Sequence, residues 1–261
     1  MKAVVSIAGS DSSGGAGIQA DIKTIAAHHL YAETVITALT AQNTLGVTGV
    51  HEVPAAFVSE QIDAVFSDIR PDAVKIGMVS SAEIIRAIAA GLDRWHAENI
   101  VVDPVMVATS GARLIGEDAI SALVEELLPR ASVITPNIPE VQVLCGRELS
   151  DEQSCERAAL ALAQSLSVDV LVKGGHGAHD ANDVLATQEG AIHWFRHEAI
   201  ATSNTHGTGC TLSSAIACGL ACGLAVPEAV SAAKEYLTGA LSAGLDLGRG
   251  SGPLDHMWQN A

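Results

Sequence analysis

Short apolar runs alternate with longer amphipathic segments along the chain. The runs, rich in β-branched and aliphatic residues, begin near residues 3, 34, 73, 100, 133 and 168. Between them, apolar residues recur at helical spacing over residues 15–29, 57–69, 84–95 and 117–128, from 139, and over 151–166. This alternation is typical of a parallel sheet with helices on both faces. No linker, repeat or low-complexity tract interrupts it, so we expect a single α/β domain over residues 1–261.

The expected strands end in polar, glycine or proline residues. Five of these ends are Gly9-Ser10-Asp11, Gly77-Met78, Asp103-Pro104, Thr135-Pro136-Asn137 and Lys173-Gly174-Gly175. Any one of them could serve only as a turn, because Gly, Pro, Asn and Asp are the usual turn residues. Open parallel sheets, however, bind ligands beyond the carboxyl ends of their strands. An acid, an amide and a lysine at this one edge therefore predict a site there.

The composition describes a folded protein with a large core. Hydrophobic residues make up 48% of the 261 residues and charged residues 17%, which excludes a largely disordered chain. The 30 acidic residues outnumber the 14 basic ones, for a net charge of -16. This charge argues against nucleic acid or an anionic membrane as the main partner. The net charge does not exclude a phosphorylated ligand, provided that hydrogen-bond donors at the site or a metal ion offset the negative charge of the protein.

The cysteines and the N-terminus indicate a reduced cytoplasmic protein. The five cysteines include no CxxC pair and no cluster with histidine at zinc spacing. The first apolar run is too short for a signal peptide, and the longest apolar-or-glycine run, residues 215–226, is too short to span a bilayer. We therefore expect a cytoplasmic protein without a membrane partner.

The clearest chemical motif is Asn204-Thr205-His206-Gly207-Thr208-Gly209-Cys210-Thr211, which leads into an apolar helical stretch. Small residues at a helix start expose consecutive backbone N–H groups, and the helix dipole adds positive charge, so this turn predicts an anion hole. The alternative is an ordinary helix entry capped by threonine. Cys210 favours the site, because a cysteine in the first helical turn is expected to have a lowered pKa and could serve as a base.

A second glycine-rich segment, residues 12–17, precedes the first expected helix. It matches neither GxGxxG nor GxxxxGK[ST] and has no lysine after its glycines, which argues against a Walker-type nucleotide site. Close approach of the backbone to a small ligand, with Asp21 shortly afterwards, and a tight strand-to-helix turn both fit this segment.

Acidic and amide residues at the strand ends match the ligands that Mg²⁺ prefers beside phosphate oxygens. They are Asp103, Asn137 and Glu140. Asn137 followed by Glu140 also has the spacing of a capping box, which stabilises a helix without any function. Lys173, which follows an apolar strand, is expected to contact phosphate.

Seven segments of the chain resemble a known family when they are taken in order. They are AGSDSSGGAGIQADIKT, ITALTAQNTLGV, KIGM, VVDPVM, ITPNIPE, VKGGH and NTHGTGCTLSSAIA. Together they are similar to the hydroxymethylpyrimidine phosphate kinases of thiamin biosynthesis, in the ribokinase-like superfamily. The resemblance implies a three-layer α/β/α sandwich with a mostly parallel sheet. It also implies ATP-dependent phosphorylation of 4-amino-5-hydroxymethyl-2-methylpyrimidine, and then of its monophosphate to the diphosphate.

The same resemblance assigns roles to individual residues. It implies that the Gln42 amide pairs with the pyrimidine and that Cys210 lies beside the hydroxymethyl oxygen. The anion hole would comprise Gly207, Thr208 and Gly209. It implies that the walls of the pyrimidine pocket are formed by Gly9, Ala16, Met78 and Val105. The residues that would handle the nucleotide and Mg²⁺ are Asn137, Glu140, Lys173 and Thr205, with Asp103 as an outer metal contact. Asp21 also belongs to the implied substrate site, without an assigned chemical role.

Other functions compete with this one. Pyridoxal or pyridoxine kinase is the nearest, but a pyridine offers Gln42 no matching pair of ring nitrogen and amino group. A sugar kinase lacks support, because we find no Asp/Asn cluster suited to several hydroxyls. A non-catalytic pyrimidine-binding protein would not need the anion hole, Glu140 and Lys173. The resemblance also implies a homodimer.

Overall fold

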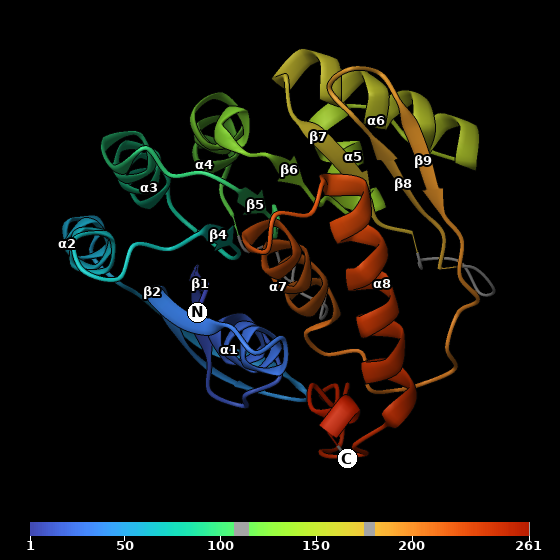
Figure 1. Ribbon diagram of the computed structural model, residues 1–261, viewed down its shortest axis with the longest axis horizontal. Coiled ribbons are helices and arrows are strands. Elements are labelled where there is room, and N and C mark those ends of the chain that lie inside the picture. The colour runs from blue at the N-terminus through green and yellow to red at the C-terminus, as the bar shows by residue number, and fades with distance from the viewer. Residues whose placement is uncertain (107–114, 175–180, 261) are drawn as a thin grey trace.

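The computed structural model describes residues 1–106, 115–174 and 181–260. In this part of the chain nine strands form one sheet in the order β3-β2-β1-β4-β5-β6-β7-β8-β9 (Figure 1). The inner strands from β2 to β7 pair in parallel, whereas β3, β8 and β9 pair antiparallel with their neighbours. The bounds are β1 Ala3–Asp11, β2 Tyr31–Asn43, β3 Gly46–Glu52, β4 Ala73–Ile76, β5 Ile100–Val102, β6 Val133–Ile134, β7 Asp169–Val172, β8 Asp183–Ala186 and β9 Ile192–Phe195.

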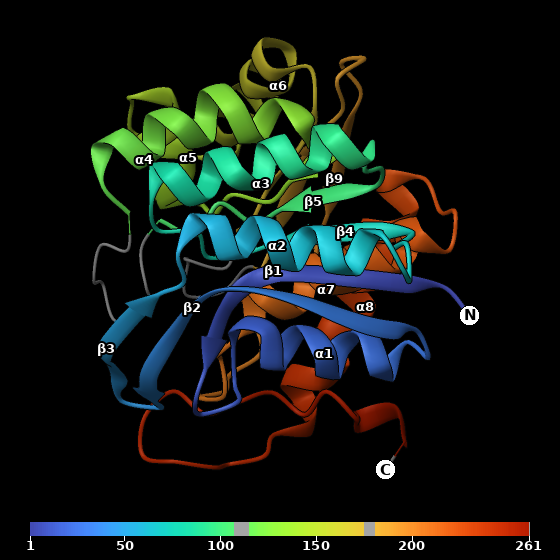
Figure 2. The ribbon, with the colours of Figure 1, turned by 90° about the vertical axis from the view of Figure 1, so that its left-hand side faces the viewer.

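Helices cover both faces of this sheet (Figures 1 and 2). One layer contains α1 (Gly17–Ala27), α7 (Thr208–Ala221) and α8 (Val226–Ala243). The other contains α2 (Ala55–Phe66), α3 (Ala82–Trp95), α4 (Glu117–Ala122), α5 (Ile138–Cys145) and α6 (Glu152–Leu166). The expected three-layer α/β/α architecture is thereby confirmed.

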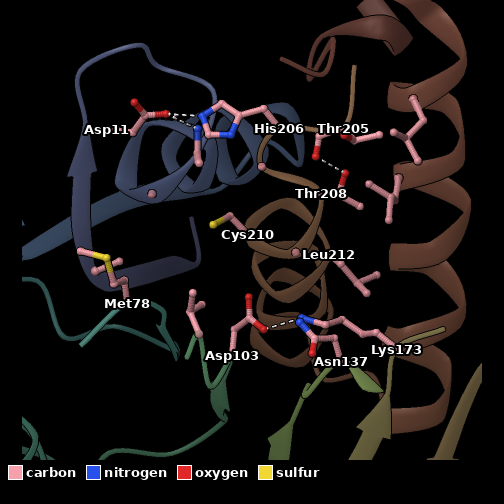
Figure 3. Close-up of a pocket in the computed structure, with 18 of the residues that line it drawn as sticks. Asp11, Met78, Asp103, Asn137, Lys173, Thr205, His206, Thr208, Cys210 and Leu212 are labelled. Carbon is pink, nitrogen blue, oxygen red and sulfur yellow. Dashed lines mark hydrogen bonds and ion pairs between the residues drawn. The ribbon is translucent and has the colours of Figure 1, made fainter. Parts of the chain in front are cut away.

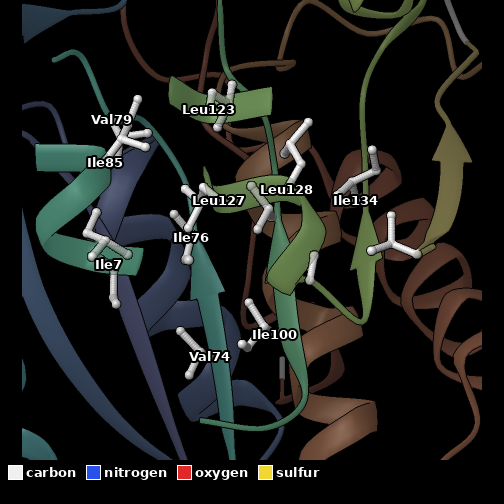
Figure 4. Packing of buried hydrophobic residues seen from close by; sticks show 14 of the residues in the cluster. Ile7, Val74, Ile76, Val79, Ile85, Ile100, Leu123, Leu127, Leu128 and Ile134 are labelled. Carbon is white, nitrogen blue, oxygen red and sulfur yellow. The ribbon is translucent and has the colours of Figure 1, made fainter. Parts of the chain in front are cut away.

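Two apolar clusters, one on each face, hold the layers together. In β5, Ile100 and Val102 join the cluster under α2–α6, while Val101 between them joins the cluster under α1, α7 and α8. Successive strand residues point to opposite faces, so a strand buried on both faces needs an unbroken apolar run. Figure 4 shows Ile76 and Leu127 among the side chains packed on the face that α2–α6 cover.

Some elements differ from the pattern in the sequence. The helix expected over 117–128 is α4 followed by a π turn (Leu123–Leu127) and a 3-10 turn (Leu128–Arg130) that contains Pro129, whose missing N–H cannot continue the α-helical bonding. The periodicity did not predict β3, whose residues are largely exposed, nor the β8–β9 hairpin and α8. A second 3-10 turn, Trp258–Asn260, lies near the C-terminus.

The strand order reverses beside β1. The chain passes from β1 to β2 on one side and later returns to β4 on the other. Open α/β sheets bind ligands at the carboxyl ends of the strands where such a reversal occurs. No helix in the described ranges is both long and apolar enough to cross a membrane.

Candidate active site

A cavity of about 550 Å³ lies at the carboxyl edge of the parallel strands. Figure 3 shows residues from the ends of β1, β4 and β5 facing the start of α7 across it. Every residue that the sequence assigned to a site, except Asp21, lines this one cavity: Gly9, Ala16, Gln42, Met78, Asp103, Val105, Asn137, Glu140, Lys173, Thr205, Gly207, Thr208, Gly209 and Cys210. The strand ends and the turn before α7 therefore belong to one site.

The turn before α7 has the geometry of an anion hole. Gly207 caps the helix with φ 88°, in the left-handed region that favours glycine, and a Cβ there would run into the carbonyl of Gly15. The first backbone bond of the helix runs from Thr211 N to Gly207 O over 2.8 Å. Within the described ranges the N–H groups of Gly209 and Cys210 have no protein acceptor. These donors are available to an anion at the positive end of the helix dipole.

Asp11 and His206 join the glycine-rich loop after β1 to this turn. His206 Nε2 lies 2.8 Å from Asp11 Oδ2, which also accepts the N–H groups of Gly15 and Ala16. Burial by itself would raise the pKa of Asp11, but the hydrogen bonds from His206, Ser13 and Ala16 outweigh it and hold that pKa well below its usual range. The carboxylate therefore stays charged. Sequence analysis missed this pair, although Asp11 ends a strand and His206 stands within the glycine-rich motif.

Gln42 lies beside the same turn. Its Nε2 is 3.4 Å from His206 Nε2, and its Oε1 is 3.1 Å from Thr40 Oγ1. Ser12 exchanges hydrogen bonds of 2.9 Å with the Gln42 backbone, which fixes the end of β2 against the glycine-rich loop.

The wall of the cavity that faces Cys210 is apolar. A Cβ at Gly9 would lie 2.6 Å from Met78 Cε, so this glycine makes room for the Met78 side chain. Figure 3 shows Met78 across the cavity from Cys210. The wall and the Gln42 amide together suit a flat ring with a polar edge.

Lys173 and Asp103 form an ion pair of 2.6 Å on the floor of the cavity. Burial disfavours the charged lysine, but Asp103 and Glu140 outweigh it and raise its pKa. A Cβ at Gly209 would lie 3.2 Å from Asp103 Oδ2 and 3.3 Å from Lys173 Nζ, so the pair is adjacent to the start of α7. Lys173 thus puts a positive charge beside the unpaired N–H groups.

Glu140 and Asn137 form the capping box that their spacing predicted. Asn137 accepts from Glu140 N over 2.9 Å, and Glu140 Oε2 accepts from Asn137 N over 2.8 Å. Burial, helped by nearby Asp103 and opposed by Lys173, raises the pKa of Glu140 to about 7. The carboxyl group therefore combines a structural role with a position on the cavity wall.

Cys210 lies in the first turn of α7, but its expected low pKa is wrong. Burial raises the pKa of its thiol, and the carboxylates of Asp21 and Asp103 raise it further. Lys75 and the Gly17 N–H act in the opposite direction and do not compensate. The thiol is therefore protonated at neutral pH, because the low-dielectric surroundings outweigh the helix terminus.

Asp21 does not reach the cavity. Its side chain is fully buried and pairs with Lys75 at 2.8 Å, and Ser6 and Ser214 donate hydrogen bonds to it. The sequence placed Asp21 among the substrate residues; the structure instead places it behind the cavity wall, joining α1, β1, β4 and α7.

Comparisons with known proteins agree with this geometry. A family model described as phosphomethylpyrimidine kinase matches residues 11–255. The chain belongs to the phosphomethylpyrimidine kinase family. The family expected from the seven motifs is confirmed, and with it the expected kinase activity.

Relatives in this family include proteins named for thiamine biosynthesis. A hydroxymethylpyrimidine/phosphomethylpyrimidine kinase of Rhizobium meliloti is 54% identical over 256 residues, which cover 97% of this chain and 96% of the relative. The thiamine biosynthesis bifunctional protein ThiED of Geobacter sulfurreducens is 52% identical over 97% of this chain, but the match spans only 52% of that protein. The chain therefore has about half the length of that relative.

Solved structures show the same fold. The crystal structure of a phosphomethylpyrimidine kinase from Clostridium difficile matches with a TM-score of 0.81 and 44% identity, covering 91% of this chain and 98% of that one. A pyridoxal kinase from Staphylococcus aureus, in complex with AMP-PCP and pyridoxal, matches with a TM-score of 0.89 and 32% identity, covering 100% of this chain and 95% of that one.

Proposed function

We propose that this chain phosphorylates 4-amino-5-hydroxymethyl-2-methylpyrimidine with ATP, and then phosphorylates the monophosphate to the diphosphate, in thiamine biosynthesis. One observation carries the proposal: Gln42, which can recognise an aminopyrimidine edge, shares one cavity with the unpaired N–H groups of α7 and with Lys173. A ring reader and a phosphoryl-binding turn are thus within reach of one small molecule. The continuous sheet supports a single kinase domain over residues 1–261.

The pyrimidine would lie between Gln42 and the wall formed by Gly9, Ala16, Met78 and Val105. A primary amide donates from its nitrogen and accepts at its oxygen, so it can pair with a ring nitrogen and the neighbouring amino group at once. The hydroxymethyl group would then face Cys210 and the start of α7, which line the same cavity.

Phosphoryl transfer would occur at the start of α7. The substrate oxygen forms a bond to the γ-phosphorus of ATP while the bond to the bridging β–γ oxygen breaks, and ADP leaves. The N–H groups of Gly209 and Cys210, together with the Lys173 ammonium, would stabilise the charge on the transferring oxygens. The first step must also release the hydroxyl proton, and Cys210 can accept it only as the thiolate, the minor form at neutral pH because burial raises the pKa of the thiol.

The second step needs no base. The attacking group is then a phosphate oxygen that is already ionised at neutral pH. The same cavity and the same donors can therefore serve both steps, because positioning and charge stabilisation supply most of the catalysis in phosphoryl transfer.

The nucleotide side of the cavity fits a hydrated Mg²⁺ ion. Asp103 and Glu140 offer carboxylates and Asn137 an amide oxygen, while the described ranges contain no group of three or more His, Cys, Asp or Glu that would form a complete cage. Mg²⁺ commonly uses one or two carboxylates and completes its shell with water and phosphate oxygens. When bound, the ion would offset charge on the ATP phosphates, and Thr205 and Lys173 would contact the nucleotide. The homodimer and the cytoplasmic location stay predictions.

The test is to incubate the purified chain with ATP, Mg²⁺ and the pyrimidine alcohol, and to resolve the mono- and diphosphate by chromatography. We expect both products in sequence, and a higher kcat/KM for the pyrimidine than for pyridoxine. The Gln42→Leu variant should lose the pyrimidine preference and keep its affinity for ATP. ATP hydrolysis without either phosphorylated pyrimidine would contradict the proposal.

A further inference from the structure

Three side chains from distant parts of the sequence form a row along the cavity: Asp11 at the end of β1, His206 before α7 and Gln42 at the end of β2. His206 Nε2 lies 2.8 Å from Asp11 Oδ2 and 3.4 Å from Gln42 Nε2. Gln42 Oε1 in turn lies 3.1 Å from Thr40 Oγ1. The charged carboxylate of Asp11, at one end of the row, determines which atoms along it donate hydrogen bonds and which accept them.

Asp11 fixes the position of the proton on His206. Its carboxylate is buried and accepts hydrogen bonds from Ser13, Gly15 and Ala16 as well as from the imidazole. A carboxylate has only acceptors, so the ring nitrogen that faces it at 2.8 Å must carry a hydrogen. This holds for the neutral Nε2–H tautomer and for the imidazolium alike.

The proton on His206 in turn determines how the Gln42 amide lies. An N–H of His206 and an NH₂ of Gln42 that face each other at 3.4 Å are two donors without an acceptor. On the other side, Thr40 has a single hydroxyl hydrogen, and both Ser10 O at 3.0 Å and Gln42 Oε1 at 3.1 Å accept from its oxygen. Both conflicts are relieved when the amide turns by half a rotation. The amide oxygen then faces the single Nε2 hydrogen as a second, weaker acceptor at 3.4 Å, while that hydrogen is donated mainly to Asp11 at 2.8 Å. On the other side the NH₂ donates to Thr40, whose hydrogen stays on Ser10.

We propose that Asp11 and His206 are positioning residues that hold the Gln42 amide with its oxygen toward α7, and so determine which heteroaromatic alcohol the enzyme prefers. This inference rests on the proposed function. In the aminopyrimidine the amino group lies next to the hydroxymethyl carbon, and the ring nitrogen lies one position further away. The amino group thus meets the amide oxygen on the α7 side, and the ring nitrogen meets the NH₂. An analogue without a hydrogen-bond donor in place of that amino group leaves the oriented oxygen unpaired once the bound ring excludes water from it, which weakens binding.

The first test locates the proton in the free enzyme and needs no turnover. Long-range ¹H–¹⁵N spectra of histidine-labelled protein distinguish a protonated Nε2 from an unprotonated one, and the His206→Gln variant assigns the signal. We expect the His206 Nε2 to be protonated at pH 8. An unprotonated Nε2 would overturn the proposal even if the enzyme phosphorylated the pyrimidine as expected.

The second test compares substrates. The His206→Phe variant keeps a flat ring but has no N–H, so we expect the ratio of kcat/KM for the aminopyrimidine over 5-hydroxymethyl-2-methylpyrimidine, which lacks the amino group, to fall at least tenfold, with the KM for ATP changed less than about threefold. The His206→Gln variant, whose amide can again donate to Asp11, should recover most of the ratio.

The His256→Phe variant is the matched control. His256 is buried and its Nε2 lies 3.0 Å from Oγ1 of Thr211, which is on α7. Neither residue lines the cavity. We expect this variant to change both substrates alike. Equal losses on both substrates in His206→Phe would show a merely structural role and overturn the inference. If the wild-type enzyme does not phosphorylate the pyrimidine, the proposed function fails, and the spectra still decide whether Asp11 fixes the proton.

Discussion

The side chains of Lys75 and Asp21 form an ion pair in which neither partner has any solvent exposure. Both carboxylate oxygens of Asp21 accept from Lys75 Nζ, at 2.8 and 2.9 Å, and hydroxyl groups from β1 and α7 also donate to them. The pair thus joins the strands to α7 behind the cavity, and the positive charge of Lys75 acts on the Cys210 thiol.

Removing one partner of this pair should destabilise the protein strongly. Lys75→Met leaves the Asp21 carboxylate buried without its cation, and we expect a loss of about 3–5 kcal/mol in the free energy of unfolding. The double variant Lys75→Met with Asp21→Leu should recover much of the loss, because it leaves no buried charge. Urea unfolding monitored by circular dichroism measures both. A single variant as stable as wild type would show that the pair has no such role.

Cys210→Ala should slow the first phosphorylation more than the second. The first step must release a hydroxyl proton, whereas the second attacks with an ionised phosphate oxygen. In assays above pH 9, where the thiolate fraction is larger, we expect a loss of about 100-fold in the first step, the range of general base catalysis, and less than about threefold in the second. Single-turnover assays with each substrate separate the two steps, and equal losses would refute the assignment.

The pH dependence of the first step tests the same thiol in the wild-type enzyme. Because burial raises the pKa of Cys210 above its ordinary value of 9.0, the thiolate fraction keeps growing as the pH rises through 9. If the thiolate accepts the proton, kcat/KM for the alcohol substrate rises as the pH increases through 9, whereas kcat/KM for the monophosphate substrate stays constant. A plateau near pH 7 for the alcohol would contradict this prediction.

Gly207→Ala should abolish most activity by opening the anion hole. An added Cβ would run into the carbonyl of Gly15, so the turn must move away from the glycine-rich loop. Gly223 at the other end of α7 is a matched control, because its φ of +86° resembles the +88° of Gly207 but nothing lies within 4 Å of its Cβ position.

Both glycine variants place alanine in the left-handed region, at a cost of about 1–2 kcal/mol in stability. We expect Gly223→Ala to keep kcat within about twofold of wild type and Gly207→Ala to lose at least 100-fold, the scale of losing an oxyanion donor. Steady-state assays on both variants check this, and similar activities would show that the turn tolerates displacement.

Glu140→Gln should flatten the dependence of stability on pH. The folded-state pKa of Glu140 is raised from 4.5 to about 7, so the folded protein binds more protons than the unfolded chain between these values. Stability from this group is fully present below pH 4.5 and is lost as the pH rises through 7, by up to about 3 kcal/mol. The difference in unfolding free energy between wild type and variant, measured from pH 4.5 to 8, should change by this amount.

Glu228→Gln controls for the loss of a capping carboxylate itself. Glu228 accepts from Ala225 N at the exposed start of α8, in the same third helical position as Glu140 in α5. A pH-dependent difference of equal size in both variants would show that the effect of Glu140→Gln does not come from burial.

The amino-acid sequence by itself determined the layers of the fold and the edge that holds the site. An unbroken apolar run such as Ile100–Val102 is stable only between two layers, and helical periodicity places one apolar face on the sheet. The polar strand ends and the turn at Gly207 could be found for the same local reason, since turns and helix caps depend on near neighbours in the chain. The resemblance of its motifs to a known family further predicted the kinase reaction and the roles of individual residues.

Only the tertiary structure decided the charge states and partners of individual side chains. Asp21 pairs with a lysine 54 positions away, and His206 meets a carboxylate 195 positions away. The pKa of Cys210 follows from the groups packed around it rather than from its place in the helix. Desolvation and electrostatic interactions depend on distance in space, and local sequence patterns do not contain that distance.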